Sequence, residues 1–348
     1  MNRDIKFMNR CIELAASGLG FTAPNPLVGC VITHENEIIG EGYHHKFGKP
    51  HAEVNAINSV KTKKLLKNST LYVTLEPCSH FGKTPPCADL IVKMGIPRVI
   101  IASKDPFRQV AGKGIEILKN AGVEVETGIL KDEYEWLNRR YFTFYKKQRP
   151  YVILKWAQSS DGFIDIKRTA DTPKITWITN ETCRTLVHKW RSEEQAILIG
   201  TETVLNDNPE LTVRRWNGKN PLRIVIDRNL TLLKKLKVFN DKAQTLVFTE
   251  TDKSSIQNNI EYRTILFDDM LLKNILKELY KRNIQSIIIE GGAYTLNSFI
   301  RKNLWDEARV FTGDVVFSKG LHAPKMYITA HSTEMIFKNK MDIYYNIL

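Results

Sequence analysis

The sequence predicts an α/β protein of two domains, and three observations support this fold class. Short apolar strands alternate with amphipathic helices along most of the 348 residues, an order typical of largely parallel sheets covered on both faces. The length is sufficient for two domains that each bury a core. A polar stretch ending in Pro150 separates two such runs, so we expect an N-terminal domain over residues 1–146 and a C-terminal domain over residues 147–348.

The N-terminal half opens with an amphipathic helix, because apolar residues recur at spacings of three and four from Ile5 to Leu19. A proline-rich turn leads into a strand over residues 28–33, and its hairpin partner is expected at residues 37–43. Beyond this hairpin the pattern alternates. The predicted helices cover residues 51–59, 86–94, 112–121 and 132–141, and the predicted strands cover residues 70–75, 98–103 and 123–128.

The C-terminal half begins with a strand over residues 151–157 and a turn at Ser159-Ser160-Asp161-Gly162. No G-x-G-x-x-G fingerprint is present. Instead, a buried strand stops at Glu290-Gly291-Gly292, where backbone amides can cradle a phosphate, although alone this motif indicates a plain strand-to-helix turn. The further predicted helices cover residues 180–191, 270–282 and 293–302, and the strands cover 195–200, 222–227, 244–249, 286–290 and stretches from 307 to the C-terminus.

Composition and charge limit the function. The chain is 43% hydrophobic and 26% charged, as globular proteins are, and it has neither a membrane-spanning apolar run nor a signal peptide, so we expect a cytoplasmic protein. Five cysteines, an odd number, suit metal ligation in a reducing compartment better than a disulfide scaffold. The net charge of +13 requires an anionic partner or substrate, and it leaves open whether that is nucleic acid or a phosphorylated small molecule.

A zinc site is predicted between residues 49 and 90. His51, Cys78 and Cys87 supply one imidazole and two thiols, a donor set suited to zinc. Three protein ligands leave a fourth position for water, which is typical of catalytic rather than structural zinc. Glu53 is not needed as a ligand and is available for proton transfer. The alternative is that His51 caps a helix and both cysteines are ordinary core residues.

The order H-x-E followed by P-C and a second cysteine is that of zinc deaminases. Residues i and i+2 of a regular helix point to opposite sides, so His51 and Glu53 converge only if both lie in its first turn. Asn25, held between two prolines, is either a turn residue or an amide that reads a base edge. His44 and His45 are candidates for substrate contact and not for zinc ligation.

The first 145 residues resemble the cytidine-deaminase-like superfamily, and within it the deaminase domain of bifunctional riboflavin-pathway enzymes. Eight residues separate the two cysteines, whereas the deaminases of cytidine and of tRNA adenosine have P-C-x-x-C. We expect the inserted loop, with His80 and Lys83, to recognise a ribose phosphate. The matching segments are Pro24-Asn25-Pro26-Leu27-Val28-Gly29, Gly48-Lys49-Pro50-His51-Ala52-Glu53 and Glu76-Pro77-Cys78-Ser79-His80-Phe81-Gly82-Lys83-Thr84-Pro85-Pro86-Cys87.

The second half resembles the reductase domain of the same family, which is similar in fold to dihydrofolate reductase and uses NADPH. The resemblance is carried by Lys155-Trp156-Ala157-Gln158, by Asp207-Asn208-Pro209-Glu210-Leu211-Thr212-Val213-Arg214 and by Glu290-Gly291-Gly292. It assigns cofactor contacts to Ala157, Trp177, Thr203, Asp207, Gly292, Ala293, Tyr294, Thr295, Leu296, Asn297 and Ser298. It assigns substrate contacts to Arg191, Leu211, Arg214 and Glu290.

Some of these assignments leave alternatives open. Two arginines suit a phosphate, since a guanidinium pairs bidentately with its oxygens. The alternative to phosphate binding is that Arg191, at the end of a helix, interacts with the helix dipole, and that Arg214 is a surface residue. Ile175 stands where the family has a small hydroxyl residue, so we give it no role.

The resemblance implies a fold and a function for the whole chain. The fold is an N-terminal cytidine-deaminase-like three-layer α/β/α domain followed by a C-terminal dihydrofolate-reductase-like α/β domain. The function is zinc-dependent hydrolytic deamination of 2,5-diamino-6-(5-phosphoribosylamino)pyrimidin-4-one, and then NADPH-dependent reduction of the ribosyl side chain to ribityl, giving 5-amino-6-(5-phosphoribitylamino)uracil. The expected cofactors are one Zn²⁺ per deaminase domain and NADPH.

The implied partner is a phosphorylated pyrimidine, with no nucleic acid and no membrane, and a homodimer or homotetramer would form through the reductase domain. The alternative function is a tRNA-editing deaminase with a basic accessory domain. That alternative predicts P-C-x-x-C and aromatic residues interleaved with a basic stripe, and the sequence shows neither.

Overall fold

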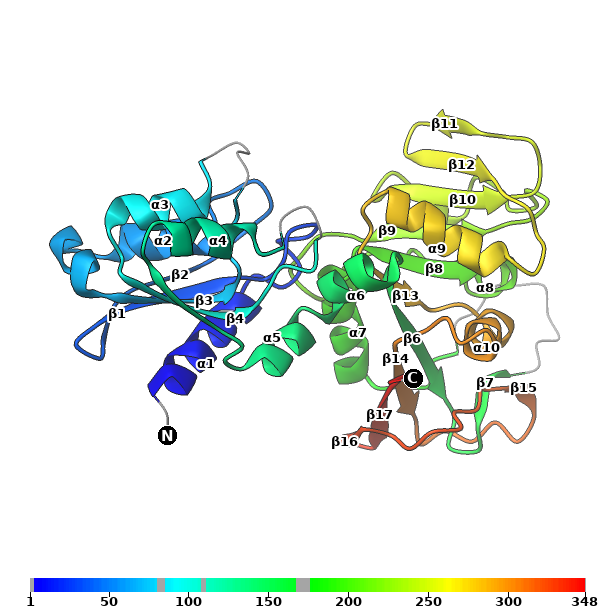
Figure 1. Cartoon of the computed structure of the whole chain (residues 1–348). Helices are drawn as coiled ribbons and strands as arrows, with labels where there is room; N and C mark the ends of the chain where they lie inside the picture. The colour runs from blue at the N-terminus through cyan, green and yellow to red at the C-terminus, as the bar shows by residue number, and fades with distance from the viewer. Residues whose placement is uncertain (1–2, 80–84, 108–110, 167–175, 348) are drawn as a thin grey trace. The chain divides into compact units, whose positions relative to one another are not determined.

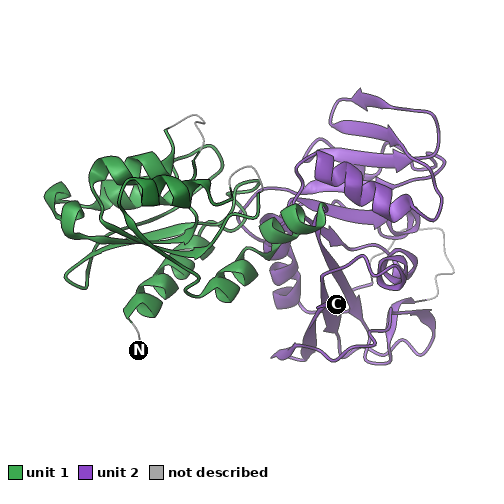
Figure 2. Ribbon diagram, in the orientation of Figure 1, with its two compact units in different colours: residues 1–148 green, residues 149–348 purple. Residues whose placement is uncertain are grey.

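The computed structural model describes residues 3–79, 85–107, 111–166 and 176–347. Its contacts divide the chain into two compact units, Met1–Gln148 and Arg149–Leu348 (Figure 2). The expected boundary after residue 146 falls two residues before this division, because helix α6 (Arg139–Lys147) extends past residue 146. The expectations for His80, Lys83 and Ile175 lie outside the described residues.

The N-terminal unit is built on a five-stranded sheet of order β2-β1-β3-β4-β5 (Figure 1). The predicted hairpin is confirmed, since β1 and β2 pair antiparallel. β1 also pairs antiparallel with β3, whereas β4 and β5 continue in parallel, so the sheet is less parallel than predicted. The strands are β1 (Gly29–His34), β2 (Glu37–Tyr43), β3 (Thr70–Leu75), β4 (Arg98–Ser103) and β5 (Glu124–Thr127).

Helices cover both faces of this sheet, as predicted for a three-layer α/β/α domain (Figure 1). One face packs against α2 (Ala52–Ser59), α3 (Cys87–Met94) and α4 (Lys113–Asn120), and the short 3₁₀ helix η1 (Lys63–Asn68) links α2 to β3. The other face packs against α1 (Arg3–Ala16), α5 (Lys131–Leu137) and α6.

The helix expected over residues 132–141 is in fact two helices, α5 and α6, which meet at Asn138. The Asn138 side chain is buried, accepts a hydrogen bond from Leu27 N at 2.8 Å and donates one to Leu27 O at 2.9 Å. These bonds tie the helix junction to the proline-rich turn. Helical periodicity could not predict this break, because the partner of Asn138 is distant in the sequence.

The C-terminal unit contains a ten-stranded sheet of order β11-β12-β10-β9-β8-β13-β6-β14-β17-β16. Every pairing from β12 to β14 is parallel, and antiparallel strands lie at both edges. The parallel strands are β6 (Tyr151–Gln158), β8 (Ala196–Gly200), β9 (Leu222–Ile226), β10 (Thr245–Thr249), β12 (Ile260–Thr264), β13 (Ser286–Ile289) and β14 (Glu307–Thr312). The edges are β11 (Ser255–Gln257), β16 (Ser332–Ile336) and β17 (Asn339–Tyr345), and β7 (Phe163–Ile166) pairs separately with β15 (Gly320–His322).

Two apolar cores lie on the two faces of this sheet. One contains residues of α7 (Glu181–Glu193) and α8 (Thr201–Asp207) together with the 3₁₀ helix η2 (Lys237–Phe239), and the other contains α9 (Leu271–Lys281) and α10 (Ala293–Arg301). The short helix α8 and the strands β7, β11 and β12 were not predicted, whereas β14, β15, β16 and β17 lie within the strand-like stretches expected from residue 307 onward.

The position of α8 matters for function. Helix α8 begins directly after β8, and α10 begins after the Glu290-Gly291-Gly292 turn that follows β13, so both lie at the carboxyl edge where open α/β sheets bind ligands. Among the described residues, every helix is too short or too polar to traverse a lipid bilayer.

Candidate active sites

The three predicted zinc ligands come together at the N-termini of two helices. His51 is the N-cap of α2, and Cys87 is the first residue of α3. His51 Nδ1 lies 3.5 Å from Cys78 Sγ and 3.4 Å from Cys87 Sγ, and all three ligand atoms are within 4.8 Å of one another. A tetrahedral zinc ion bonded to nitrogen and sulfur at about 2.0 and 2.3 Å separates these atoms by roughly 3.5 Å. The donor set therefore fits zinc, with a fourth position left for water.

The helix termini favour thiolate at this site. Cys87 N donates to Cys78 Sγ at 3.3 Å, so the open amides of α3 face the sulfur. Hydrogen bonds from the Cys87 and His51 side chains hold the pKa of the Cys78 thiol well below its usual value. A thiolate is the form that binds metal.

Glu53 lies in the first turn of α2, where His51 and Glu53 can converge. The backbone of His51 is extended, so the regular helix begins only after it. Glu53 is 3% exposed, and burial together with the negative charge of Cys78 raises the pKa of its carboxyl to about 7. A carboxyl with this pKa can both accept and release a proton near neutral pH.

Glu76 and Gly114 hold Cys78 in place, and sequence reasoning missed both roles. The buried Glu76 carboxylate accepts hydrogen bonds from Gly112 N at 2.9 Å and Gly114 N at 3.0 Å, at the start of α4. A Cβ on Gly114 would stand only 1.9 Å from the carbonyl oxygen of Pro77, the residue before Cys78. The E-P-C motif was a signal for Glu76, but its partners lie in another segment.

We expect Gly114→Ala to weaken zinc affinity by about 10- to 100-fold, the usual effect of disturbing the shell around metal ligands. The added methyl must displace Pro77, and Cys78 would move with it. Zinc retained per chain during titration with a chelator measures the effect. Lys113→Ala, at the exposed preceding residue, is the matched control, and equal zinc retention in both variants would contradict the prediction.

Asn25 and His44 lie beside the zinc ligands. Asn25 Nδ2 is 3.1 Å from His44 Nε2, His44 Nδ1 is 3.1 Å from Pro50 O, and the His44 ring meets the His51 ring edge-on at 5.5 Å. If His44 Nδ1 donates to the carbonyl, Nε2 accepts from the amide of Asn25, whose Oδ1 can then accept from a ligand. Asn25 N also donates to Thr22 O, so the residue is both part of a turn and close to the metal site.

The predicted cofactor residues meet partly at the start of α10. Thr203 Oγ1 accepts a hydrogen bond from Gly292 N at 2.8 Å, which joins α8 to the N-terminus of α10. The N-cap residue of α10, Gly292, has no side chain to cap the terminus, so the first amides of α10 can bind a phosphate. Thr295 closes the junction, because Cβ atoms on Gly200 and Gly291 would stand 3.1 and 2.9 Å from its side chain.

The other predicted cofactor residues differ in their surroundings. Ala157 lies near the end of β6, Asp207 ends α8, and Ala293, Asn297 and Ser298 belong to α10. Tyr294 is 81% exposed, whereas Leu296 is fully buried in the core, so only its backbone is available to a cofactor. Trp177 is exposed and its ring lies under the Arg184 guanidinium at 4.3 Å. This contact does not join Trp177 to the start of α10, and its cofactor role stays a prediction.

The predicted substrate residues Arg191 and Glu290 form a nearly buried ion pair. Arg191 Nε and Nη2 lie 3.1 and 2.7 Å from the two carboxylate oxygens of Glu290. Lys155 Nζ is 3.8 Å from the same carboxylate, and the three side chains are only 10–15% exposed. Sequence reasoning quoted Lys155 in a motif but gave it no role; a lysine in an otherwise apolar strand was the available signal.

Arg214 and Leu211 lie beside this ion pair. Arg191 Nη1 donates to Thr212 O at 3.4 Å, and Arg214 Nη1 donates to Thr212 Oγ1 at 2.8 Å, so two guanidinium groups meet the same residue. Leu211 is 2% exposed and its side chain packs into the core, so its backbone is the part available to a substrate, and its substrate contact stays a prediction. Two arginines that meet at Thr212 form a receptor for an anion such as phosphate.

His188 supports this arginine pair from α7. It is 6% exposed, and its Nδ1 accepts a hydrogen bond from Arg214 N at 3.2 Å. Burial, reinforced by the charges of Arg191 and Arg214, lowers the pKa of His188 to about 4. His188 is therefore neutral at pH 7, and it is a second residue whose role the sequence did not reveal.

We expect His188 to make stability depend on pH. Its folded pKa is below the unfolded value of about 6.5, so below that pH the unfolded chain binds a proton that the folded chain does not. Stability then falls as the pH drops towards 4, by about 2 kcal/mol at pH 5. Denaturant unfolding at pH 7 and pH 5 gives the loss of stability between the two pH values. This loss should be smaller by this amount in His188→Asn, whose amide keeps a hydrogen-bond acceptor, than in the wild type. Equal losses in the two proteins would refute the role of His188.

Comparison with known proteins finds a matching family for each of the two units. Residues 1–103 match the cytidine and deoxycytidylate deaminase zinc-binding region, and residues 150–322 match the RibD C-terminal domain. The riboflavin biosynthesis proteins RibD of Aquifex aeolicus and Bacillus amyloliquefaciens are 42% and 41% identical to this chain, over 91% and 92% of it and 89% and 86% of their own lengths. The crystal structure of a diaminohydroxyphosphoribosylaminopyrimidine deaminase/5-amino-6-(5-phosphoribosylamino)uracil reductase from Thermotoga maritima has a TM-score of 0.87 and 38% identity, covering 98% of each chain.

Fold and sites together define a two-domain enzyme that joins a zinc-dependent deaminase to an NADPH-dependent reductase. The chain belongs to the RibD family of bifunctional riboflavin biosynthesis proteins. The predicted fold class, bifunctional activity, zinc and NADPH are confirmed, and a small-molecule pyrimidine substrate agrees with this family. Nothing in these relatives supports the tRNA-editing alternative.

Proposed function

We propose that this chain deaminates 2,5-diamino-6-(5-phosphoribosylamino)pyrimidin-4-one and then reduces the product to 5-amino-6-(5-phosphoribitylamino)uracil. The T. maritima protein is described as carrying out the corresponding two activities. The observation that carries the proposal is the convergence of His51, Cys78 and Cys87 beside the buried Glu53.

In the deaminase step, we assign zinc ligation to His51, Cys78 and Cys87, and proton transfer to Glu53. A bound zinc ion would supply hydroxide at neutral pH, by lowering the pKa of water. Glu53 takes one proton from the attacking water and gives it to the ring nitrogen. After the hydroxyl group has added to the ring carbon, Glu53 moves the second proton from this hydroxyl to the amine, which leaves as ammonia while the carbon keeps the oxygen.

Asn25 and His44 are proposed to orient the pyrimidine. The 3.1 Å contact between Asn25 Nδ2 and His44 Nε2 directs the Asn25 carbonyl oxygen to accept a hydrogen bond. An amino group on the ring edge is the matching donor. The two residues act as a pair because His44 is itself anchored to Pro50 O.

In the reductase step, NADPH supplies the hydride, and the chain holds cofactor and substrate in place. The open amides at Gly292 and the first turn of α10 are proposed to bind a cofactor phosphate, with Thr203 fixing this loop. Ala157, Trp177 and Asp207 are assigned to the cofactor by resemblance. Arg191 and Arg214 are proposed to bind the substrate phosphate, and Glu290 holds Arg191.

We further propose that the protein is cytoplasmic, acts on no nucleic acid and assembles into a homodimer or homotetramer through the reductase unit. All five cysteines are free thiols, which suits a reducing compartment. The exposed Met335 and Phe337, on and beside the edge strand β16, support self-association. Light scattering during size-exclusion chromatography would test the assembly.

The test of the whole proposal is mass spectrometry of the product formed from the diaminopyrimidinone phosphate, together with metal analysis. Without NADPH we expect one amine to be replaced by oxygen, and with NADPH a further gain of two hydrogens. Zinc should be present at one ion per chain. Turnover of tRNA adenosine instead, with no change in the pyrimidine, would overturn the proposal.

A further inference from the structure

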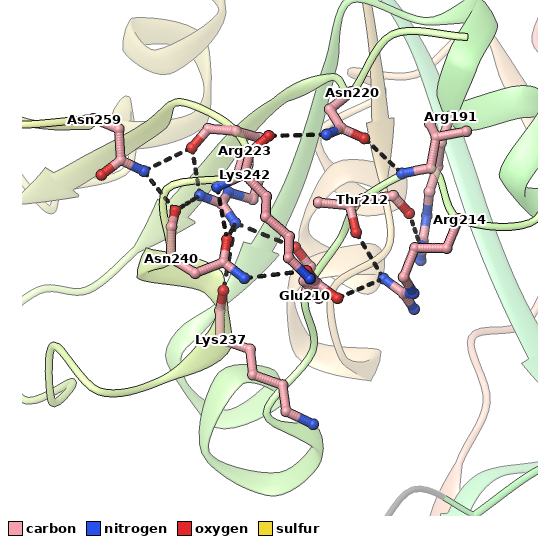
Figure 3. Close-up of polar contacts among 12 residues, drawn as sticks. Arg191, Glu210, Thr212, Arg214, Asn220, Arg223, Lys237, Asn240, Lys242 and Asn259 are labelled. Atoms are coloured by element: carbon pink, nitrogen blue, oxygen red, sulfur yellow. Dashed lines mark hydrogen bonds and ion pairs between the residues drawn. The ribbon is translucent and has the colours of Figure 1, made fainter. Parts of the chain in front are cut away.

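Glu210 joins the predicted phosphate-binding arginine to a buried polar network (Figure 3). Its carboxylate lies 3.3 Å from Arg214 Nη1 and 2.7 Å from Lys242 Nζ, and it accepts a hydrogen bond from Asn240 Nδ2 at 3.1 Å. The Glu210 side chain is 13% exposed, whereas those of Arg214 and Lys242 are 46% and 60% exposed. Glu210 is therefore the fixed group between two long cationic side chains.

The network begins at Arg223, a fully buried residue of β9. Arg223 donates to Asn240 Oδ1 at 2.7 Å, to Thr245 Oγ1 at 3.0 Å, and to the carbonyls of Asn240 and Ala243. It also donates to the carbonyl of Glu210 at 3.4 Å. Moving this guanidinium would leave buried donors unpaired, so Asn240 and Glu210 are held firmly from the sheet (Figure 3).

The backbone after Glu210 needs such support. Leu211 has φ of 58°, a left-handed conformation that is unfavourable for a bulky side chain. Strained residues persist where their surroundings fix them. Here Arg223 holds the Glu210 carbonyl on one side of Leu211, and Arg191 holds the Thr212 carbonyl on the other.

We propose that Glu210 is a positioning residue of the reductase, which holds the Arg214 guanidinium next to Arg191 so that both face the substrate phosphate. This inference rests on the proposed phosphate-binding role of Arg214. Lys242 offsets the charge of Glu210, so the carboxylate can anchor Arg214 without repelling the phosphate strongly. Without the anchor, a half-exposed arginine would lose rotamer freedom on binding, and affinity would fall.

The decisive variant is the double substitution Glu210→Gln with Lys242→Met. It removes one negative and one positive charge together, so the net charge near the phosphate is unchanged. We expect the KM for the phosphorylated reductase substrate to rise about fivefold, the effect of one freed arginine side chain. The kcat and the KM for NADPH should stay within about twofold of the wild-type values. The kcat/KM for the dephosphorylated substrate should not change, because this substrate has no phosphate for Arg214 to bind.

Three comparisons make the result specific. Arg214→Ala must raise the same KM; if it does not, the phosphate role of Arg214 is wrong. If Arg214→Ala raises the KM and the double variant does not, Glu210 is not a positioning residue. Glu261→Gln, which breaks the 2.6 Å ion pair of Arg282 with Glu261 in the same unit and leaves that of Arg282 with Glu278, should leave the KM unchanged. The deaminase rate of each sample controls for enzyme concentration.

A single variant covers the case in which the double variant does not fold. Lys242→Met changes an exposed side chain and removes one of the two cations paired with Glu210, so the carboxylate is less well neutralised. The KM for the phosphorylated substrate should then rise with that for the dephosphorylated substrate unchanged, because only the phosphate is repelled. An unchanged KM would place Glu210 outside the phosphate site and overturn the inference.

Discussion

Glu53→Gln should lower the deaminase turnover by a factor of about 10²–10⁴, the usual contribution of a general acid–base group. The amide has nearly the same size as the carboxyl but cannot carry the proton from water to the leaving amine. The effect should fall on this step because Glu53 is buried beside the three ligands and its pKa is close to 7. Ammonia release measured at saturating substrate gives the turnover.

The same variant should leave zinc content and NADPH-dependent reduction unchanged, because Glu53 is not a ligand in this arrangement. Cys78→Ala is the contrasting variant, and it should lose both zinc and deaminase activity. Loss of zinc from Glu53→Gln would make Glu53 a ligand. Retention of more than half of the wild-type turnover would exclude it from proton transfer.

The zinc centre was predictable because its ligands and its proton carrier lie in short, recognisable sequence motifs. His51, Cys78 and Cys87 are few and distinctive donors, and the position of Glu53 relative to His51 requires the first turn of a helix, which the structure has. What supports these residues was not predictable. Glu76 and Gly114 meet across 38 residues, and only the folded chain shows that a Cβ at 114 would strike Pro77.

The reductase site could be predicted only through the family resemblance. Arg191 and Glu290 are separated by 99 residues, and neither stands in a motif with a chemical meaning of its own. Their pairing follows from the sheet, in which β13 lies between β8 and β6 and brings Lys155 to the same carboxylate. The resemblance also gives every residue of a matched segment the same role, so it could not show that the Leu296 and Leu211 side chains are buried in the core.

Glu290→Gln should destabilise the C-terminal unit by about 3–5 kcal/mol and abolish most of its reductase activity. The carboxylate balances two nearly buried cations, Arg191 and Lys155, and removal of one member of such a group leaves uncompensated buried charge. Denaturant unfolding followed by circular dichroism gives the stability, and NADPH oxidation gives the activity. Glu261→Gln is the control, because the more exposed pair that it breaks with Arg282 is worth less than about 1 kcal/mol.

The pH dependence of the wild-type protein offers an independent check of this charge balance. Burial alone would raise the pKa of Glu290, but the positive charges of Arg191 and Lys155 outweigh it and lower the pKa to about 2. A folded pKa below the unfolded value of about 4.3 means that the carboxylate stabilises the fold above that pH, and that this contribution is lost as the pH falls towards 2. The shift corresponds to about 3 kcal/mol, in agreement with the effect expected for the variant. Glu290→Gln should lack this part of the acid dependence, whereas a variant whose stability fell with acid as steeply as that of the wild type would show that the ion pair does not act as argued.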